Sequence, residues 1–196
     1  MAGVSNLTAA QLARQYAGGE RSPVEVTRAI LERIGAWEPR INALYRLHAE
    51  AALAQAQAAE ARWRAGKPLS ALDGVPLTIK ENIHTRGDPT PIGTRANDDA
   101  PPQSADAPPA ARVREAGAVI LGKTTMPDYG MLSSGVSSLH GITRNPWRLD
   151  HNSSGSSSGA AAAAPEPELE PDGLRSRRQG LRVMPCRLDR PEESIP

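Results

Sequence analysis

The sequence contains no phenylalanine, and aromatic residues make up only 3% of its 196 residues. Its core must therefore be built from leucine, isoleucine, valine and much alanine. No apolar run is long enough to cross a bilayer, so the sequence predicts no transmembrane helix. The formal net charge of only +1 gives no case for a nucleic-acid partner or for a membrane-surface partner.

Cysteine is almost absent as well. A single cysteine, Cys186, excludes an internal disulfide and fits a reducing compartment. The first ten residues have neither a basic segment nor an apolar segment, so they predict no signal peptide. Together these features predict a cytoplasmic protein of one ordinary domain. Phosphate-binding glycine motifs are missing after the predicted strands, and neither a cofactor nor a metal is expected.

Three helices are predicted in the first third of the chain. Thr8 and Ser22 each begin a capping-box pattern, which marks the start of a helix. Apolar residues fall on one face of the second helix, at Val26, Ile30 and Ile34. This helix is expected to end at residues 38–39, because the residue before a proline disfavours helical geometry. An alanine-rich helix follows at 49–65, and all three helices are interpreted as scaffold.

Residues 72–82, LDGVPLTIKEN, predict a turn followed by a short strand. Apolar side chains alternate along it, at Val75, Leu77 and Ile79, which is typical of a strand with one apolar face. Lys80 ends this strand on the opposite face. Taken alone, a lysine at a strand end is most often a solvated charge.

A second strand is predicted at 118–121, an apolar run that Gly122 is expected to end. Residues 110–116 before it predict the last part of a helix. The order strand, helix, strand predicts a βαβ unit and therefore an α/β fold.

A loop rich in serine and glycine, residues 153–159, runs into the alanines at 160–164. Two interpretations remain open from the residues alone. The segment is either a flexible linker or a loop whose backbone N–H groups face an anion or an oxyanion.

Four segments in order carry a resemblance to a known family: LDGVPLTIKEN, AGAVILGKTTMPDYG at 116–130, GITRNPW at 141–147 and SGSSSGAAAAA at 154–164. They resemble the N-terminal part of the amidase signature family, over about residues 7–164. The chain is more similar to general amidases than to the glutamyl-tRNA amidotransferase A subunit. The resemblance implies an α/β/α sandwich, with a mixed sheet flanked by helices, and hydrolysis of small-molecule carboxylic amides by a Ser, cis-Ser, Lys triad.

The resemblance also assigns roles to residues. Lys80 matches the catalytic lysine. The GGSSGG pattern aligns with residues 154–159, which places the bridging serine at Ser156, or at Ser157 if the register slips by one. Serines replace two glycines of that pattern, at 154 and 158. Two further residues are placed near the acyl pocket, Gly130 and Met131.

The resemblance stops after residue 164. The family's next motif, GTDxGGSxR, supplies the serine that forms the acyl ester and the N–H groups that bind the oxyanion. Residues 173–186 contain no such motif, and Ser176 lies among arginines in a different context. The sequence therefore predicts that the nucleophile and the C-terminal half of the family domain are missing from this chain, and that the chain is inactive.

Residues 165–196 change character abruptly to a run rich in proline, glutamate and arginine. Such a composition cannot pack into a core, which predicts a disordered tail unrelated to the amidase-like part at 1–164. A shifted reading frame would explain the change. The alternative to an inactive amidase is a non-catalytic binding module derived from one, which docks through an exposed sheet edge.

Overall fold

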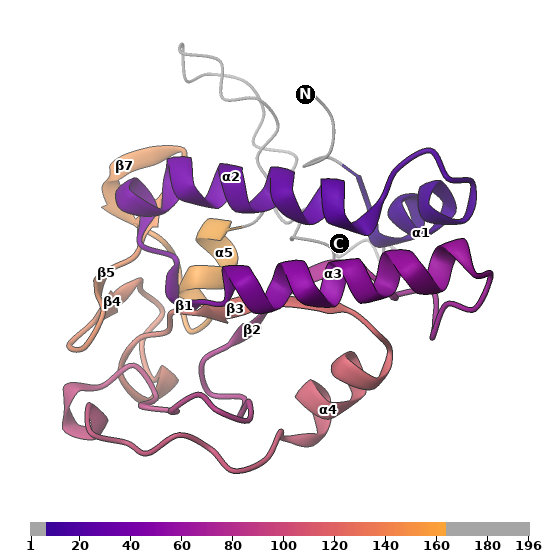
Figure 1. Cartoon of the computed structure of the whole chain (residues 1–196). Helices are drawn as coiled ribbons and strands as arrows, with labels where there is room; N and C mark the ends of the chain where they lie inside the picture. Colours follow the sequence, from indigo (N-terminus) through magenta and orange to yellow (C-terminus); the bar gives the residue numbers. More distant parts are fainter. Residues whose placement is uncertain (1–6, 164–196) are drawn as a thin grey trace, which may run out of the picture.

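A computed structural model of the chain describes residues 7–163, which form a layered arrangement of helices and strands (Figure 1). The tail predicted at 165–196 lies outside the described residues. The five helices among the described residues are α1 (Ala9–Ala17), α2 (Pro23–Ile41), α3 (Ala49–Arg64), α4 (Pro108–Glu115) and α5 (Ser158–Ala163). The main strands are β1 (Leu44–Leu47), β2 (Pro76–Lys80) and β3 (Val119–Thr124). Four shorter strands follow: β4 (Val136–Ser137), β5 (Gly141–Ile142), β6 (Arg144–Asn145) and β7 (Arg148–Asn152).

The central sheet has the strand order β1-β3-β2. Strands β2 and β3 pair in parallel and are joined through α4, as the predicted βαβ unit requires. Strand β1 pairs with β3 in the antiparallel direction, so the sheet is mixed. The short strands form two separate hairpins, β4 with β5 and β6 with β7.

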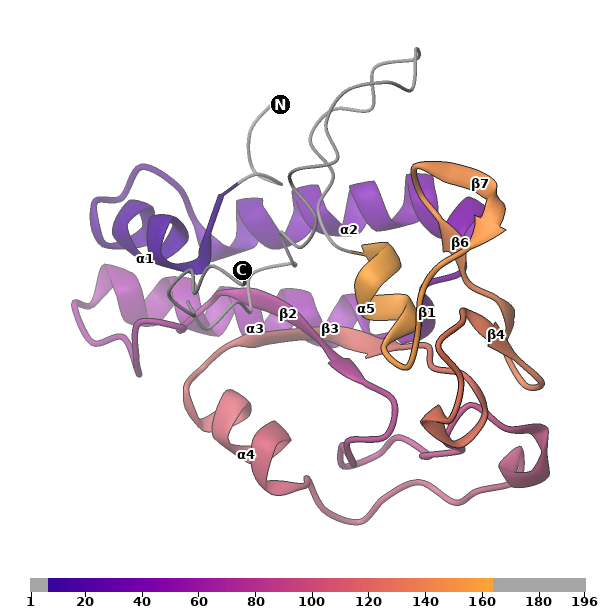
Figure 2. The same cartoon turned by 180° about the vertical axis from the view of Figure 1, so that it is seen from behind.

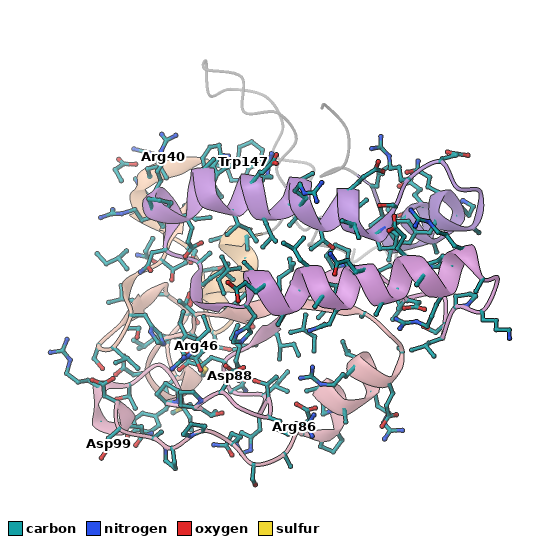
Figure 3. All side chains as sticks on the ribbon, viewed as in Figure 1. Arg40, Arg46, Arg86, Asp88, Asp99 and Trp147 are labelled. Carbon is teal, nitrogen blue, oxygen red and sulfur yellow. The ribbon has the colours of Figure 1, made fainter. Side chains whose placement is uncertain are left out.

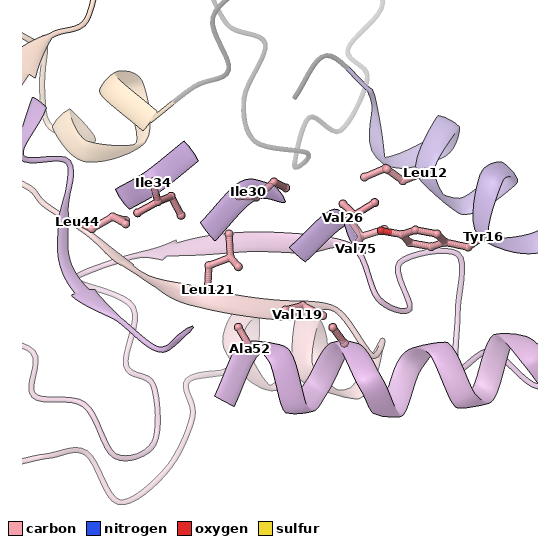
Figure 4. Close-up of a cluster of buried hydrophobic side chains, with 11 residues drawn as sticks. Leu12, Tyr16, Val26, Ile30, Ile34, Leu44, Ala52, Val75, Val119 and Leu121 are labelled. Carbon is pink, nitrogen blue, oxygen red and sulfur yellow. The ribbon is translucent and has the colours of Figure 1, made fainter. Parts of the chain in front are cut away.

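Helices cover both faces of this sheet (Figures 1 and 2). One core cluster joins α1, α2 and α3 to the sheet and contains Val26, Ile30, Val119 and Leu121 (Figure 4). A second cluster joins α4 to the other face, with Ala110 against Leu77, Ile79 and Ile120. The result is a partial α/β/α sandwich, which confirms the predicted fold class.

A β-bulge in β3 decides which side chains lie on which face. Leu77 pairs with Ile120, whereas the next residue, Thr78, pairs with Gly122, so β3 has one extra residue at Leu121. After the bulge, Lys123 pairs with Ile79 and therefore shares its face of the sheet. The partner of Lys80 is Thr124, on the opposite face.

Three details of the predicted elements are wrong. Helix α2 continues through Pro39 to Ile41 and ends where Asn42 adopts a left-handed backbone, with φ of 51°, and donates its N–H to the Glu38 carbonyl. Strand β3 continues through Gly122, because this glycine allows a close approach: a Cβ there would lie 2.1 Å from the Arg46 carbonyl oxygen. Val75 precedes β2 and packs in the first cluster, away from Leu77 and Ile79.

The hairpins and α5 gather at the end of the molecule where α2 ends. Arg40 of α2 and Trp147 of the β6–β7 turn are both found there (Figure 3). A small apolar cluster of Ile41, Ala43 and Ala162 holds α5 against this end. Within residues 7–163, no helix has the length and apolar character needed to cross a membrane.

Candidate active site

The side chain of Lys80 meets the serine-rich loop at the end of β2. Its Nζ donates a hydrogen bond to Ser156 Oγ at 3.0 Å, across 76 residues of sequence. The backbone fixes Lys80 on both sides: Lys80 pairs with Thr124 in the sheet, and its carbonyl accepts a hydrogen bond from the Ile83 N–H at 3.0 Å. The amine is therefore held by a strand end and a turn.

Close backbone contacts place the loop that carries Ser156. The Gly155–Ser156 peptide bond is cis. A Cβ on Gly155 would lie 2.3 Å from the Leu132 carbonyl oxygen, and a Cβ on Gly159 would lie 2.0 Å from the Ala43 carbonyl oxygen. The Gly159 N–H also donates to the Thr125 carbonyl at 3.0 Å. Glycine is needed at both positions because only backbone fits between the loop and its neighbours.

The two serines that stand at glycine positions of the pattern differ in their surroundings, and the buried Oγ of Ser158 has no hydrogen-bond partner among the described residues. Ser154 is exposed, and Ser158 is 1% exposed at the first residue of α5. The two ends of the loop are therefore packed differently, and Gly155 and Gly159 make the close approaches.

Burial lowers the pKa of Lys80, and the neighbouring Glu81 carboxylate opposes this effect. A lowered pKa increases the fraction of neutral amine, which is the form that accepts a proton. Burial also lowers the pKa of Lys123, whose Nζ donates to the Ile83 carbonyl at 2.7 Å. Lys123 lies on the other face of the sheet, so Lys80 is the lysine that contacts the serine loop.

The remaining predicted site residues divide into two groups. Gly130 lies beside Ser156: a Cβ at Gly130 would be 3.7 Å from Ser156 Cβ. Met131 is 81% exposed, and Ser157 is also exposed, with its carbonyl accepting the Ala161 N–H. The structure therefore brings Lys80, Ser156 and Gly130 together, and it leaves the side chains of Met131 and Ser157 at the surface.

The structure adds a buried acidic residue that sequence reasoning missed. Glu81 is fully buried, and its two carboxylate oxygens accept from the Gly93 N–H at 2.8 Å and from His140 Nε2 at 2.9 Å. Glu81 and His140 are 59 residues apart, so no local spacing connects them. Among the described side chains, no three His, Cys, Asp or Glu residues cluster as metal ligands do.

Comparison with known proteins finds similarity over most of this region. The family model described as Amidase matches residues 25–164. The chain is 45% identical over 151 residues to the glutamyl-tRNA(Gln) amidotransferase A subunit of Acidothermus cellulolyticus, which covers 76% of this chain and 30% of that relative. It is 35% identical to the native peptide amidase of Stenotrophomonas maltophilia, with a TM-score of 0.73, over 81% of this chain and 34% of that one. Fatty acid amide hydrolase gives a TM-score of 0.76 at 28% identity.

The chain thus spans 30% to 34% of the length of the first two of these relatives. Identity to the amidotransferase subunit is higher than identity to the peptide amidase. These values give no support to the prediction that the chain is more similar to general amidases than to the glutamyl-tRNA amidotransferase A subunit.

Proposed function

Because the chain belongs to the amidase family, we propose that its described residues form the proton-relay half of a site that hydrolyses carboxylic amides at non-peptide C–N bonds. Lys80 is the general base, and Ser156 is the bridge that passes the proton. The observation that carries this proposal is the 3.0 Å contact between Lys80 Nζ and Ser156 Oγ. That distance is within reach for proton transfer.

The chemistry needs a base because a serine hydroxyl is a poor nucleophile at neutral pH. As the nucleophilic serine attacks the amide carbonyl, its proton passes to Ser156 Oγ, and the proton of Ser156 passes to the neutral Lys80 amine. The proton then returns along the same path to the leaving nitrogen, which departs as ammonia or an amine. Water hydrolyses the resulting acyl ester and releases the free acid.

We also propose that the chain as written does not complete this reaction. Its sequence after residue 164 contains no GTDxGGSxR segment to supply the acyl-forming serine and the oxyanion N–H groups. The relay would then act only where that segment is provided. Gly130, beside Ser156, and Met131 are the proposed contacts to the acyl part of the substrate.

A fusion with a relative tests the relay. Residues 25–163 of this chain replace the matching third of the Stenotrophomonas maltophilia peptide amidase, whose own sequence supplies the remainder. The fusion is expected to hydrolyse an amide substrate, and Lys80→Ala is expected to lower kcat/KM by about 10²- to 10⁴-fold, the usual contribution of a general base.

Lys80→Arg serves as the matched variant. Arginine keeps the positive charge but cannot lose its proton, so a base role predicts a loss similar to that of Lys80→Ala. Retention of most activity in the arginine variant would show that only the charge matters and would overturn the base role.

A binding module is the second candidate, and exposed apolar side chains beside the site favour it. Tyr129, Met131 and Leu132 are 55%, 81% and 49% exposed. Contiguous exposed apolar residues mark surfaces that bind a partner or a ligand. Co-purification of one defined protein with the chain, reduced by Met131→Ser, would support this candidate. Recovery of the chain without a reproducible partner would contradict it.

A further inference from the structure

We propose that Glu81 is a positioning residue for the Lys80–Ser156 pair: its buried carboxylate braces the end of β2 against two loops and places a negative charge next to Lys80 in the sequence. This inference rests on the proposed role of Lys80 as a base. It concerns a neighbouring residue that does not touch the serine loop in this structure.

The bracing is direct. The Glu81 N–H donates to the Thr124 carbonyl at 3.1 Å, which extends the β2–β3 pairing one residue past Lys80. One carboxylate oxygen holds the Gly93 N–H, and the other holds His140 Nε2. Glu81 therefore ties together the strand end next to Lys80, the loop after β2 and the connection between β4 and β5.

Both partners of the Glu81–His140 hydrogen bond are shielded from water. The Glu81 side chain is 0% exposed and the His140 side chain is 9% exposed. The Tyr45 ring packs on His140, with ring centroids 5.1 Å apart. A buried carboxylate acts on its neighbours through a low local dielectric, so its charge has more effect here than at the surface.

The Glu81 charge raises the pKa of Lys80 on β2, of Lys123 on β3 and of Tyr45 on β1, and the carboxylate contacts His140 after β4. Asp88, in the loop after β2, also raises the pKa of Tyr45 and of Lys123. The Asp106 charge also raises the pKa of Lys123. Of these groups, Glu81 is the anion whose charge raises the pKa of Lys80.

The sign of the effect follows from the charges. Burial favours the neutral amine of Lys80, whereas the Glu81 carboxylate favours the ammonium form. A relay base needs both properties, because it must be neutral to accept a proton and basic enough to hold it. Glu81 thus limits how far burial lowers the pKa of Lys80.

Lysine titration in the full chain tests this role. The chain has three lysines, Lys67, Lys80 and Lys123, so [13Cε]lysine labelling gives three assignable NMR resonances. Lys67 is exposed and serves as the internal reference. Glu81→Gln removes the charge and keeps an oxygen that can accept from the Gly93 N–H, while its NH2 group can pair with His140 in the tautomer whose Nε2 accepts. We expect the titration midpoint of Lys80 to shift downward, and that of Lys123 to shift in the same direction.

Asp73→Asn is the matched control. Asp73 is also a fully buried carboxylate, paired with Arg62 at 2.6 Å, but it lies before the opposite end of β2. The Asp73→Asn substitution is expected to destabilise the fold and to leave the titration midpoint of Lys80 unchanged. A purely structural role for Glu81 predicts that Glu81→Gln behaves in the same way, and that result would overturn the proposal.

A second variant covers the case in which Glu81→Gln does not fold. Glu81→Asp keeps the charge on a shorter side chain, so the Lys80 midpoint should not fall below that of the wild type; a fall would contradict the proposal. If neither variant folds while Asp73→Asn does, Glu81 serves the fold alone and the proposal fails. Because NMR reads the amine directly, a shift with Glu81→Gln stands even if Lys80→Ala has no effect on the fusion enzyme.

Discussion

At the scale of single residues, the chemistry of Lys80 depends on what surrounds it. The same lysine on an open strand end would be a solvated ammonium group. Here it is partly buried, contacts Ser156 Oγ at 3.0 Å and has a carboxylate as its sequence neighbour. Burial and the contact with Ser156 are the grounds on which we propose that the amine accepts a proton.

The two candidate bridging serines give a direct prediction. In the fusion enzyme, Ser156→Ala is expected to lower kcat/KM by about 10²- to 10⁴-fold, because the proton path is cut. Ser157→Ala is expected to leave kcat/KM close to that of the parent fusion, since Ser157 is exposed. A larger loss with Ser157→Ala than with Ser156→Ala would place the bridge one residue later.

Some residues of the site could be predicted from the sequence and others could not. Lys80 and Ser156 were placed by matching family motifs, and neither composition nor spacing alone would have paired them. The pairing of Glu81 with His140 had no sequence signal, because a contact across 59 residues depends on how the chain packs. Gly130 was placed near the pocket by resemblance, and the structure puts it beside Ser156.

At the scale of elements, α5 is the piece that sets the serine loop against the sheet. Its described part has six residues, and tertiary contacts hold these in place. The closest approach is at Gly159, where the backbone of Ala43 and of Thr125 leaves no room for a Cβ.

Two glycine substitutions in the full chain test this packing. Gly159→Ala is expected to lower the free energy of unfolding by about 1–3 kcal/mol or more, because the added methyl overlaps backbone atoms. Gly35→Ala is the control: Gly35 lies within α2 with nothing near its missing Cβ, so it should stabilise by about 0.4–1 kcal/mol. Chemical denaturation measures both changes. If both variants changed the free energy of unfolding by the same amount, the close approach at α5 would be contradicted.

The start of α4 gives a prediction about pH. The hydrogen bond from Arg114 lowers the pKa of Asp106, as does the Arg86 backbone N–H. A carboxyl group with a lowered pKa stabilises the fold above its unfolded pKa of about 3.9, and this stabilisation is lost as the pH falls through the lower folded value. Because the pair is partly exposed and screened by solvent, Asp106→Asn should cost about 0.2–1 kcal/mol at pH 7.

Urea denaturation at several pH values checks this prediction. The difference in unfolding free energy between the wild type and Asp106→Asn should shrink as the pH falls below about 4. A difference that stays constant down to pH 2 would show that the ionised carboxylate is not the source of the stabilisation.

Elements with a clear cap or periodic pattern were predicted, whereas several of the shortest strands were not. The caps at Thr8 and Ser22 form the predicted hydrogen bonds, and the stripe on α2 packs in the core. Strand β1 and the β4–β7 hairpins lacked a sustained period, since they are only two to five residues long. The predicted end of α2 at Pro39 was wrong because the helix ends only after the proline, where Asn42 has a left-handed backbone.

At the scale of the whole molecule, the described residues form a sandwich with a small sheet. Three strands support the Lys80–Ser156 pair, and the matched part of the chain covers 30% to 34% of two of its relatives. We expect the chain on its own to show no amide hydrolysis above the rate without enzyme, because no nucleophile segment is present in its sequence. Turnover by the chain that Lys80→Ala abolishes would contradict this expectation.

The tail at 165–196 has a separate test at the level of the gene. If a shifted reading frame produced it, resequencing the coding DNA around the Ala164 codon should reveal GTDxGGSxR in another frame. If no frame contains this motif, the tail is genuine, and the binding-module interpretation gains weight.

The most direct test of the central claim is a double-mutant cycle on Lys80 and Ser156 in the fusion enzyme. Residues that pass one proton act as a unit, so their losses do not multiply. We predict that kcat/KM of the Lys80→Ala, Ser156→Ala double variant is about as low as that of the worse single variant. If the two losses multiply instead, Lys80 and Ser156 act independently, and the relay proposed from their 3.0 Å contact is wrong.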